Sequence, residues 1–287
     1  MLLLVACSSP DAPSDPAPDP APDPVGTPTR SASSPITTTA PTVPPATSPA
    51  PGPAYSTWPL GERPLPVGPD GYGVVRPTPA TLRDRRYPTR DLLPPPVGGR
   101  WRSGVGPVTP AIAARLAWEP GCPVALADLR YVTVAFRGFD DAAHTGELVV
   151  AASKAADVVS VFRALFAADF PIEEMRLTAL AELDLPPTGD GNNTGAYVCR
   201  PTTGQSSGFS AHAFGLALDL DPFQNPYLKG DRVLPELASS YLDRSRVRPG
   251  MVLAGSLAVR EFARIGWSWG GDFTTLRDYQ HFTATGR

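Results

Sequence analysis

The distribution of proline divides this chain into two regions that cannot fold in the same way. Of the 37 prolines, 25 lie before residue 101, which leaves 12 for the remaining 187 residues. Proline fixes its own φ angle and lacks a backbone donor, so a dense run of prolines excludes helix interiors and central strands. A single globular domain is therefore expected in the second region.

The first region has two parts of different composition. Between Cys7 and Tyr55 the chain has no aromatic residue, one Arg and no Lys. Such a composition buries too little apolar surface to offset the entropy of ordering the chain. We predict a disordered, extended linker over residues 8–58. Residues 59–108 remain proline-rich but contain several aromatic residues, and we interpret them as a transitional segment able to pack against the domain.

The N-terminal sequence MLLLVACSSP resembles the end of a bacterial lipoprotein signal, in which the lipidated cysteine follows a short apolar box. The segment at residues 1–7 lacks a basic n-region, so the true start is expected upstream of Met1. On this interpretation Cys7 carries the lipid, and the protein is an exported lipoprotein of the cell membrane that faces the cell wall. The alternative is a frayed apolar terminus.

Charge and hydropathy exclude two classes of partner for the rest of the chain. The net charge is −3 and there is no long basic run, which argues against nucleic acid. No later apolar stretch approaches the ~20 residues needed to cross a bilayer. We expect a monomer whose only contact with the membrane is its N-terminal lipid.

Two further cysteines, Cys122 and Cys199, lie in the second region. In an exported protein a pair of cysteines is most simply a disulfide. Two buried thiols are the alternative.

Hydrophobic periodicity in the second region predicts an α+β fold, a small antiparallel sheet with packed helices. Thr109 and Pro110 have the residue types of a helix N-cap and first helical position. His144 is expected at a hairpin tip, as a turn residue. The other expected elements are a hairpin of strands at 130–136 and 147–152, helices at 157–170 and 256–266, and a strand at 173–180.

One histidine, His212, precedes an aspartate by seven residues in the sequence SAHAFGLALDLDP. On a straight strand seven residues span ~23 Å, too far for two ligands of one metal ion. Gly215 is the residue at which the chain can bend. After it, the alternation of LALDLD places Ala217, Asp219 and Asp221 on one face, so Asp219 can face a returning His212.

A second cluster, in GWSWGGDFTTLRDYQHF, contains Asp278 and His281. These residues lie three apart, on opposite faces of a regular strand, so a turn or bulge is needed before both can serve one site. Two imidazoles and a carboxylate leave a fourth position open, the pattern of a catalytic zinc. Spacing alone leaves a hydrogen-bonded structural pair equally open. Trp267 and Trp269 fit a substrate cleft or the core.

Three ordered motifs resemble the M15 family of zinc peptidases, which comprises D-alanyl-D-alanine carboxypeptidases and related peptidoglycan endopeptidases. SAHAFGLALDLDP is similar to the family pattern S-x-H-x-x-G-x-A-x-D. GWSWGGDF with DYQHF resembles its closing motif, and NNTGAYVCR resembles a third segment, from which it departs at Gly195 and Val198. The resemblance covers residues 109–287, which we take as the zinc peptidase domain.

The resemblance implies a role for each matching residue. His212, Asp219 and His281 are the expected zinc ligands, and Asp278 is the expected general base. Arg200 would polarise the scissile carbonyl, although it is also typical of a surface charge. Ser210 has the position of a substrate-contacting serine.

The function implied is hydrolysis of peptidoglycan stem peptides, chiefly as a D-alanyl-D-alanine carboxypeptidase. The alternatives are an endopeptidase of the same family and a zinc-containing module that binds cell wall without cutting it.

Overall fold

A computed structural model describes residues 55–205 and 207–286. The signal-like segment 1–7 with its Cys7, and most of the linker expected over 8–58, lie outside the described residues. In the described part, no helix combines the length and the apolar character that a membrane span requires.

The main sheet is antiparallel and is built on the expected hairpin. Strand β2 (Leu129–Arg137) pairs with β3 (Ala143–Ala151), and β1 (Ser103–Pro107) adds to the other edge of β2. Val132, Val134 and Phe136, which the alternation placed on one face, are all buried. The hairpin is confirmed, but β3 begins earlier than expected and the connection is shorter.

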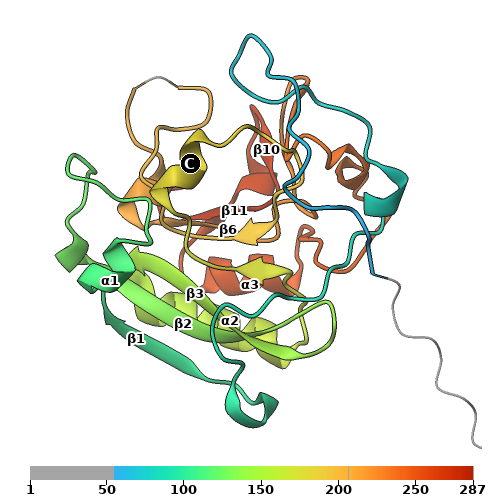
Figure 1. The fold of residues 1–287 in the computed structure, drawn as a ribbon. Coiled ribbons are helices and arrows are strands. Elements are labelled where there is room, and N and C mark those ends of the chain that lie inside the picture. The colour runs from blue at the N-terminus through green and yellow to red at the C-terminus, as the bar shows by residue number, and fades with distance from the viewer. Residues whose placement is uncertain (1–54, 206, 287) are drawn as a thin grey trace, which may run out of the picture. The chain divides into compact units, whose positions relative to one another are not determined.

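Two amphipathic helices complete the main hydrophobic core. Helix α2 (Ala155–Ala167) packs on β2 and buries the predicted stripe, which includes Val158 and Phe162. Helix α3 (Leu257–Arg264) packs beside α2 (Figure 1). Phe262 of α3 stacks on Phe282, with ring centroids 3.9 Å apart. Since Phe282 follows His281 directly, the core holds the C-terminal motif in place.

The C-terminal half adds three short sheets. Two are antiparallel, with strand orders β6–β11–β9 and β10–β7–β8, and one is the parallel pair β4–β5. Their strands are β4 (Glu174–Met175), β5 (Asn193–Thr194), β6 (Ala217–Asp219), β7 (Tyr227–Lys229), β8 (Arg232–Leu234), β9 (Ser268–Trp269), β10 (Arg277–Asp278) and β11 (His281–Thr283). The mixture of small antiparallel sheets and few helices confirms the α+β class.

Short helical turns connect these elements. Helix α1 (Pro110–Ala113) begins as predicted, since the Thr109 hydroxyl accepts a hydrogen bond from the Ile112 amide. The 3₁₀ helices are η1 (Ala80–Leu82), η2 (Val97–Gly99), η3 (Leu126–Asp128), η4 (Ala152–Lys154), η5 (Leu180–Asp184), η6 (Ala211–Phe214), η7 (Ser239–Leu242) and η8 (Gly270–Asp272).

The transitional segment is an integral part of the folded unit (Figure 1). Arg85 is buried and forms a two-bond ion pair with Glu173, with nitrogen–oxygen distances of 2.6 and 2.9 Å. A third bond of 2.7 Å joins Arg85 to the carbonyl of Asp190. Removing one partner of such a buried pair leaves an uncompensated charge, which is strongly destabilising. A fragment that begins at residue 109 would lack Arg85 and β1.

Three sequence-based assignments are wrong. Only Glu174 and Met175 of the strand expected at 173–180 are extended, and they pair in parallel with β5. His144 is not a turn residue: it lies in β3, is buried, and bonds at 2.9 Å to both Asp91 and Asp140. Asp221 does not share the face of Asp219. The backbone leaves the strand there at φ +41°, and Asp221 accepts a bond from the Glu173 amide.

The predicted disulfide is present. Cys122 and Cys199 are bonded, with their Cα atoms 5.9 Å apart and a sequence separation of 77 residues. Closing a loop of this length in the unfolded chain contributes about 4 kcal/mol of stability in the chain-entropy treatment. The bond also ties the segment that carries Arg200 to the start of the main sheet.

Candidate metal centre

His212 is positioned by a short turn between two fixed points. Ser210 caps η6, its hydroxyl accepting a 3.4 Å bond from the amide of His212. Gly215 ends the turn with φ +66°. A Cβ there would lie 2.4 Å from the backbone nitrogen of Ala151, so only glycine fits. The predicted bend at Gly215 is confirmed, and it returns the chain into β6.

Asp219 and His281 face each other through strand pairing. Asp219 ends β6, His281 begins β11, and the two residues are direct partners in the antiparallel register. Directly opposite residues on one face have Cβ atoms about 5 Å apart. On its other side Asp219 exchanges backbone bonds of 2.8 and 3.0 Å with Gly195. The backbone therefore fixes two of the three expected ligands before any side chain is considered.

The turn between Asp278 and His281 has its own support. Trp269 donates its indole N–H to the Tyr279 carbonyl at 2.8 Å. A Cβ on Gly270 would lie 2.5 Å from the Asp278 carbonyl oxygen, so only glycine at the start of η8 allows the backbone to approach Asp278 this closely. Asp278 ends β10 and His281 begins β11, which is the turn that the spacing required.

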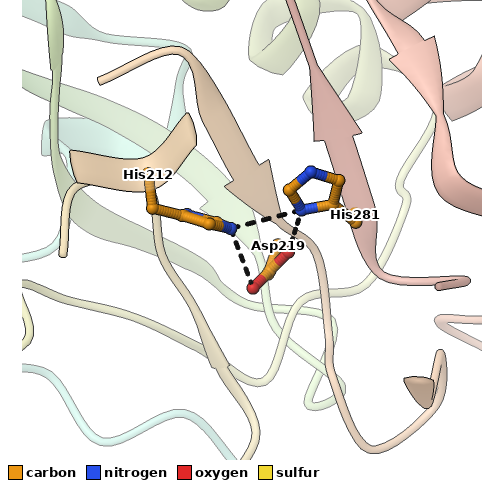
Figure 2. Close-up of side chains that lie close together, drawn as sticks. All are labelled: His212, Asp219 and His281. Carbon is orange, nitrogen blue, oxygen red and sulfur yellow. Dashed lines mark hydrogen bonds and ion pairs between the residues drawn. The ribbon is translucent and has the colours of Figure 1, made fainter. Parts of the chain in front are cut away.

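The donor atoms of His212, Asp219 and His281 converge on one point (Figure 2). Nε2 of His212 lies 3.2 Å from Nδ1 of His281. Of the two Asp219 carboxylate oxygens, Oδ1 lies 3.0 Å from the His281 nitrogen and Oδ2 lies 3.3 Å from the His212 nitrogen. Among the described residues, this is the group of three or more His, Cys, Asp or Glu whose donor atoms lie close enough to hold a metal ion.

These distances fit a tetrahedral zinc ion. Bonds of about 2.0 Å around a tetrahedral ion place neighbouring ligand atoms about 3.3 Å apart. The other ring nitrogen of His212, Nδ1, lies 2.6 Å from the Ala196 carbonyl, and as the donor there it leaves Nε2 unprotonated for a metal. The donor set of two imidazoles and one carboxylate is also typical of zinc, and it leaves a fourth position open.

The charge state of Asp219 suits a ligand. Burial acts to raise the pKa of Asp219, but attraction and hydrogen bonds from His212 and His281 outweigh it and lower that pKa. The carboxylate is therefore ionised at neutral pH, as metal binding requires.

Asp278 lies beside this group but is not part of it. Burial raises the pKa of Asp278 to about 7, as does the negative charge of Asp219, while His281 and Arg200 act to lower it. Its Oδ1 atom is buried and has no hydrogen-bond partner among the described residues. This oxygen is free to receive a proton from substrate or water.

Arg200 and Ser210 both line the cleft that contains the three donors. The Arg200 guanidinium donates at 3.1 Å to the Pro201 carbonyl and to the Thr203 hydroxyl, and the described residues offer it no ion pair. Its position in the cleft is compatible with binding an anionic group. The Ser210 hydroxyl is occupied as the cap of η6, so the local structure already accounts for a serine there.

The cleft has a volume of about 1570 Å³ and extends well beyond the metal donors. Small-molecule sites typically measure about 300–1,000 Å³. Sequence reasoning missed several of the residues that line it, among them Tyr227, Asp272 and the upstream residues Leu60, Gly61 and Pro64. No local motif marks these residues, because they reach the cleft through tertiary packing. Trp267 and Trp269 are buried in the core cluster and do not line the cleft.

The comparisons with known proteins place the site in a family. Residues 203–284 match the family model described as D-alanyl-D-alanine carboxypeptidase, a little under a third of the chain. No curated protein and no solved structure matches the chain. The matched segment contains His212, Asp219, Asp278 and His281, in the order of the two motifs that it covers, whereas NNTGAYVCR with Arg200 lies just before it. The match supports the resemblance to the M15 family of peptidases over the segment that forms the site.

Proposed function

We propose that this protein is a zinc-dependent peptidase that hydrolyses peptidoglycan stem peptides, acting chiefly as a D-alanyl-D-alanine carboxypeptidase. One observation carries the proposal: one ligand atom each from His212, Asp219 and His281 lie within 4.8 Å of one another in a large cleft. Beside them is a buried carboxylate oxygen of Asp278 without a partner among the described residues. The family match supports a peptide as the substrate.

The proposed roles follow from the chemistry of each group. His212, Asp219 and His281 would hold the zinc ion, which supplies a Lewis acid and lowers the pKa of a bound water. Asp278 would take the proton of the attacking water and deliver it to the departing amine as the carbon–nitrogen bond breaks. Arg200 would place its charge near the oxygen that becomes negative in the transition state.

A binding module without catalysis is the alternative of a different class. Such a module needs the metal or the cleft but has no need for a general base. Asp278 favours the enzyme, because its Oδ1 has no partner among the described residues and its pKa is raised. Leaving a buried carboxyl oxygen without a partner costs free energy, and binding alone does not explain that cost.

Digestion of purified cell wall tests the proposal. The full-length protein, loaded with zinc, is incubated with peptidoglycan, and mass spectrometry identifies the released fragments. Loss of single terminal residues supports the carboxypeptidase, and conversion of crosslinked peptides to monomers supports an endopeptidase. Zinc-loaded protein that binds the wall and leaves every fragment unchanged would be a binding module.

We also propose that the enzyme is exported and anchored through a lipid on Cys7, in line with the sequence MLLLVAC. The long proline-rich linker would then give the enzyme reach from the membrane to the wall. Cys7→Ser should move the protein out of the membrane fraction of expressing cells or block its processing. Equal membrane recovery of both forms would contradict the anchor.

A further inference from the structure

One wall of the cleft comes from residues far upstream of the family match. Leu60, Gly61 and Pro64 line the same cleft as His212 and Asp278. They belong to the proline-rich transitional segment, which contains none of the three motifs. The side chain of Leu60 is 39% exposed, so it presents apolar surface to the cleft.

Specific bonds hold this wall in place. Asp190, which is buried, accepts a 2.9 Å bond from the Trp58 indole and a 3.1 Å bond from the Gly61 amide. The Leu65 amide donates to the Pro187 carbonyl at 2.7 Å. Hydrogen bonds to a charged acceptor are the stronger class, so residues 58–65 are anchored on both sides of Leu60 and Pro64.

The pairing of one segment sets an upper limit on the distance from the wall to the metal donors. Gly195 pairs with Asp219, and two residues after the end of β6 the Asp221 amide donates to the Thr194 hydroxyl at 3.1 Å. Phe223 then donates its amide to the Asn192 side chain at 2.7 Å. Residues 190–195 therefore run antiparallel to residues 219–223, away from the metal donors.

This segment ends at the anchor of the wall. Five residues of extended chain span at most about 16–18 Å, so Asp190 lies within that distance of Gly195 and the neighbouring Asp219. A bound peptide in extended form covers the same distance with four or five residues. The wall is thus placed to contact a long substrate away from the scissile bond.

We propose that residues 58–64 form the far wall of the substrate cleft, and that Leu60 and Pro64 bind an apolar part of the peptide up to about five residues from the scissile bond. The inference rests on the proposed peptidase function and adds a determinant of substrate length. A longer bound peptide also explains the volume of the cleft, which is larger than the two terminal residues of a substrate require.

Two synthetic peptides with the same D-alanyl-D-alanine end test the wall. One is an acetylated dipeptide and the other extends the same end by five residues with an apolar residue farthest from it. In the full-length protein, Leu60→Ser combined with Pro64→Ser should lower the ratio of kcat/KM for the long peptide to that for the short one about tenfold. Trp58→Phe, which removes the indole donor, should lower the ratio in the same direction.

The control is Leu92→Ser, since Leu92 is an upstream leucine that is 52% exposed and does not line the cleft. It should keep the wild-type ratio. If the double variant is folded and has the wild-type ratio of kcat/KM values, the proposed role of the wall is wrong.

A binding measurement separates this inference from the proposed function. The long peptide is titrated calorimetrically into Asp278→Asn protein and into the same protein that also carries Leu60→Ser and Pro64→Ser. The protein with the two wall substitutions should bind the peptide about tenfold more weakly. If the wild type cleaves neither peptide, the peptidase proposal fails, and the titration still decides the wall. Equal affinity in the titration, or no binding to either protein, would overturn it.

Discussion

Replacing Asp278 with Asn should lower kcat by about 10²- to 10⁴-fold while the protein keeps its zinc. The amide has the shape of the carboxyl but cannot accept a proton near neutral pH. Because proton transfer occurs in the transition state, the loss should fall on kcat more than on KM. Steady-state kinetics with a D-alanyl-D-alanine peptide, together with metal analysis of the same sample, measures both.

The matched control is Asp128→Asn, the same change at an exposed residue of η3 that does not line the cleft. It should behave as wild type. An Asp278→Asn protein that is folded, zinc-loaded and nearly as fast as wild type would remove the proposed base. A variant that loses its zinc would instead make Asp278 part of the metal site.

His281→Ala should abolish activity altogether, because it removes one of the three metal donors and leaves the β6–β11 backbone pairing in place. Peptide hydrolysis by the purified variant, compared with wild type that has been stripped by a chelator and reloaded with zinc, gives the measurement. The stripped wild type should be as inactive as the variant, and zinc should restore only the wild type. Full turnover by metal-free wild type would contradict a metallopeptidase.

His144→Gln is the matched control for a histidine change. His144 is the histidine outside the site, bonded to Asp91 and Asp140 at the main sheet. Its loss is expected to lower stability and leave the metal in place. Circular dichroism of both variants separates loss of folding from loss of the ion.

Local sequence patterns predicted the parts of the fold that local physics controls. The alternation at Val132, Val134 and Phe136 gave β2, and the spacing of Val158 and Phe162 gave α2, because each pattern reports burial on one face of one element. Gly215 was found for the same kind of reason, since the distance between His212 and Asp219 demanded a bend.

The pattern failed where distant partners decide the structure. His144 lies in β3 because β3 pairs with β2 as far as Phe136 and beyond, and its ring bonds Asp91, which lies 53 residues away. Arg85 is buried because Glu173 meets it across 88 residues, so the transitional segment proved integral to the folded unit. No periodicity within either segment records such a pairing.

The candidate site was predictable in its residues and not in its surroundings. The motifs named the three donors and Asp278, and the β6–β11 register then showed why Asp219 and His281 meet. The upstream wall at Leu60 and Pro64 was missed because the motifs begin far after it. The cleft is assembled from segments whose contacts arise only on folding.

Metal content, measured by mass spectrometry on exhaustively dialysed full-length protein, tests the central claim most directly. Wild type, His212→Ala and Asp278→Asn are compared side by side. If His212, Asp219 and His281 hold one ion, wild type and Asp278→Asn should carry about one zinc per chain, and folded His212→Ala should carry almost none. Wild-type protein without zinc after loading, or His212→Ala with a full equivalent, would contradict the metal centre.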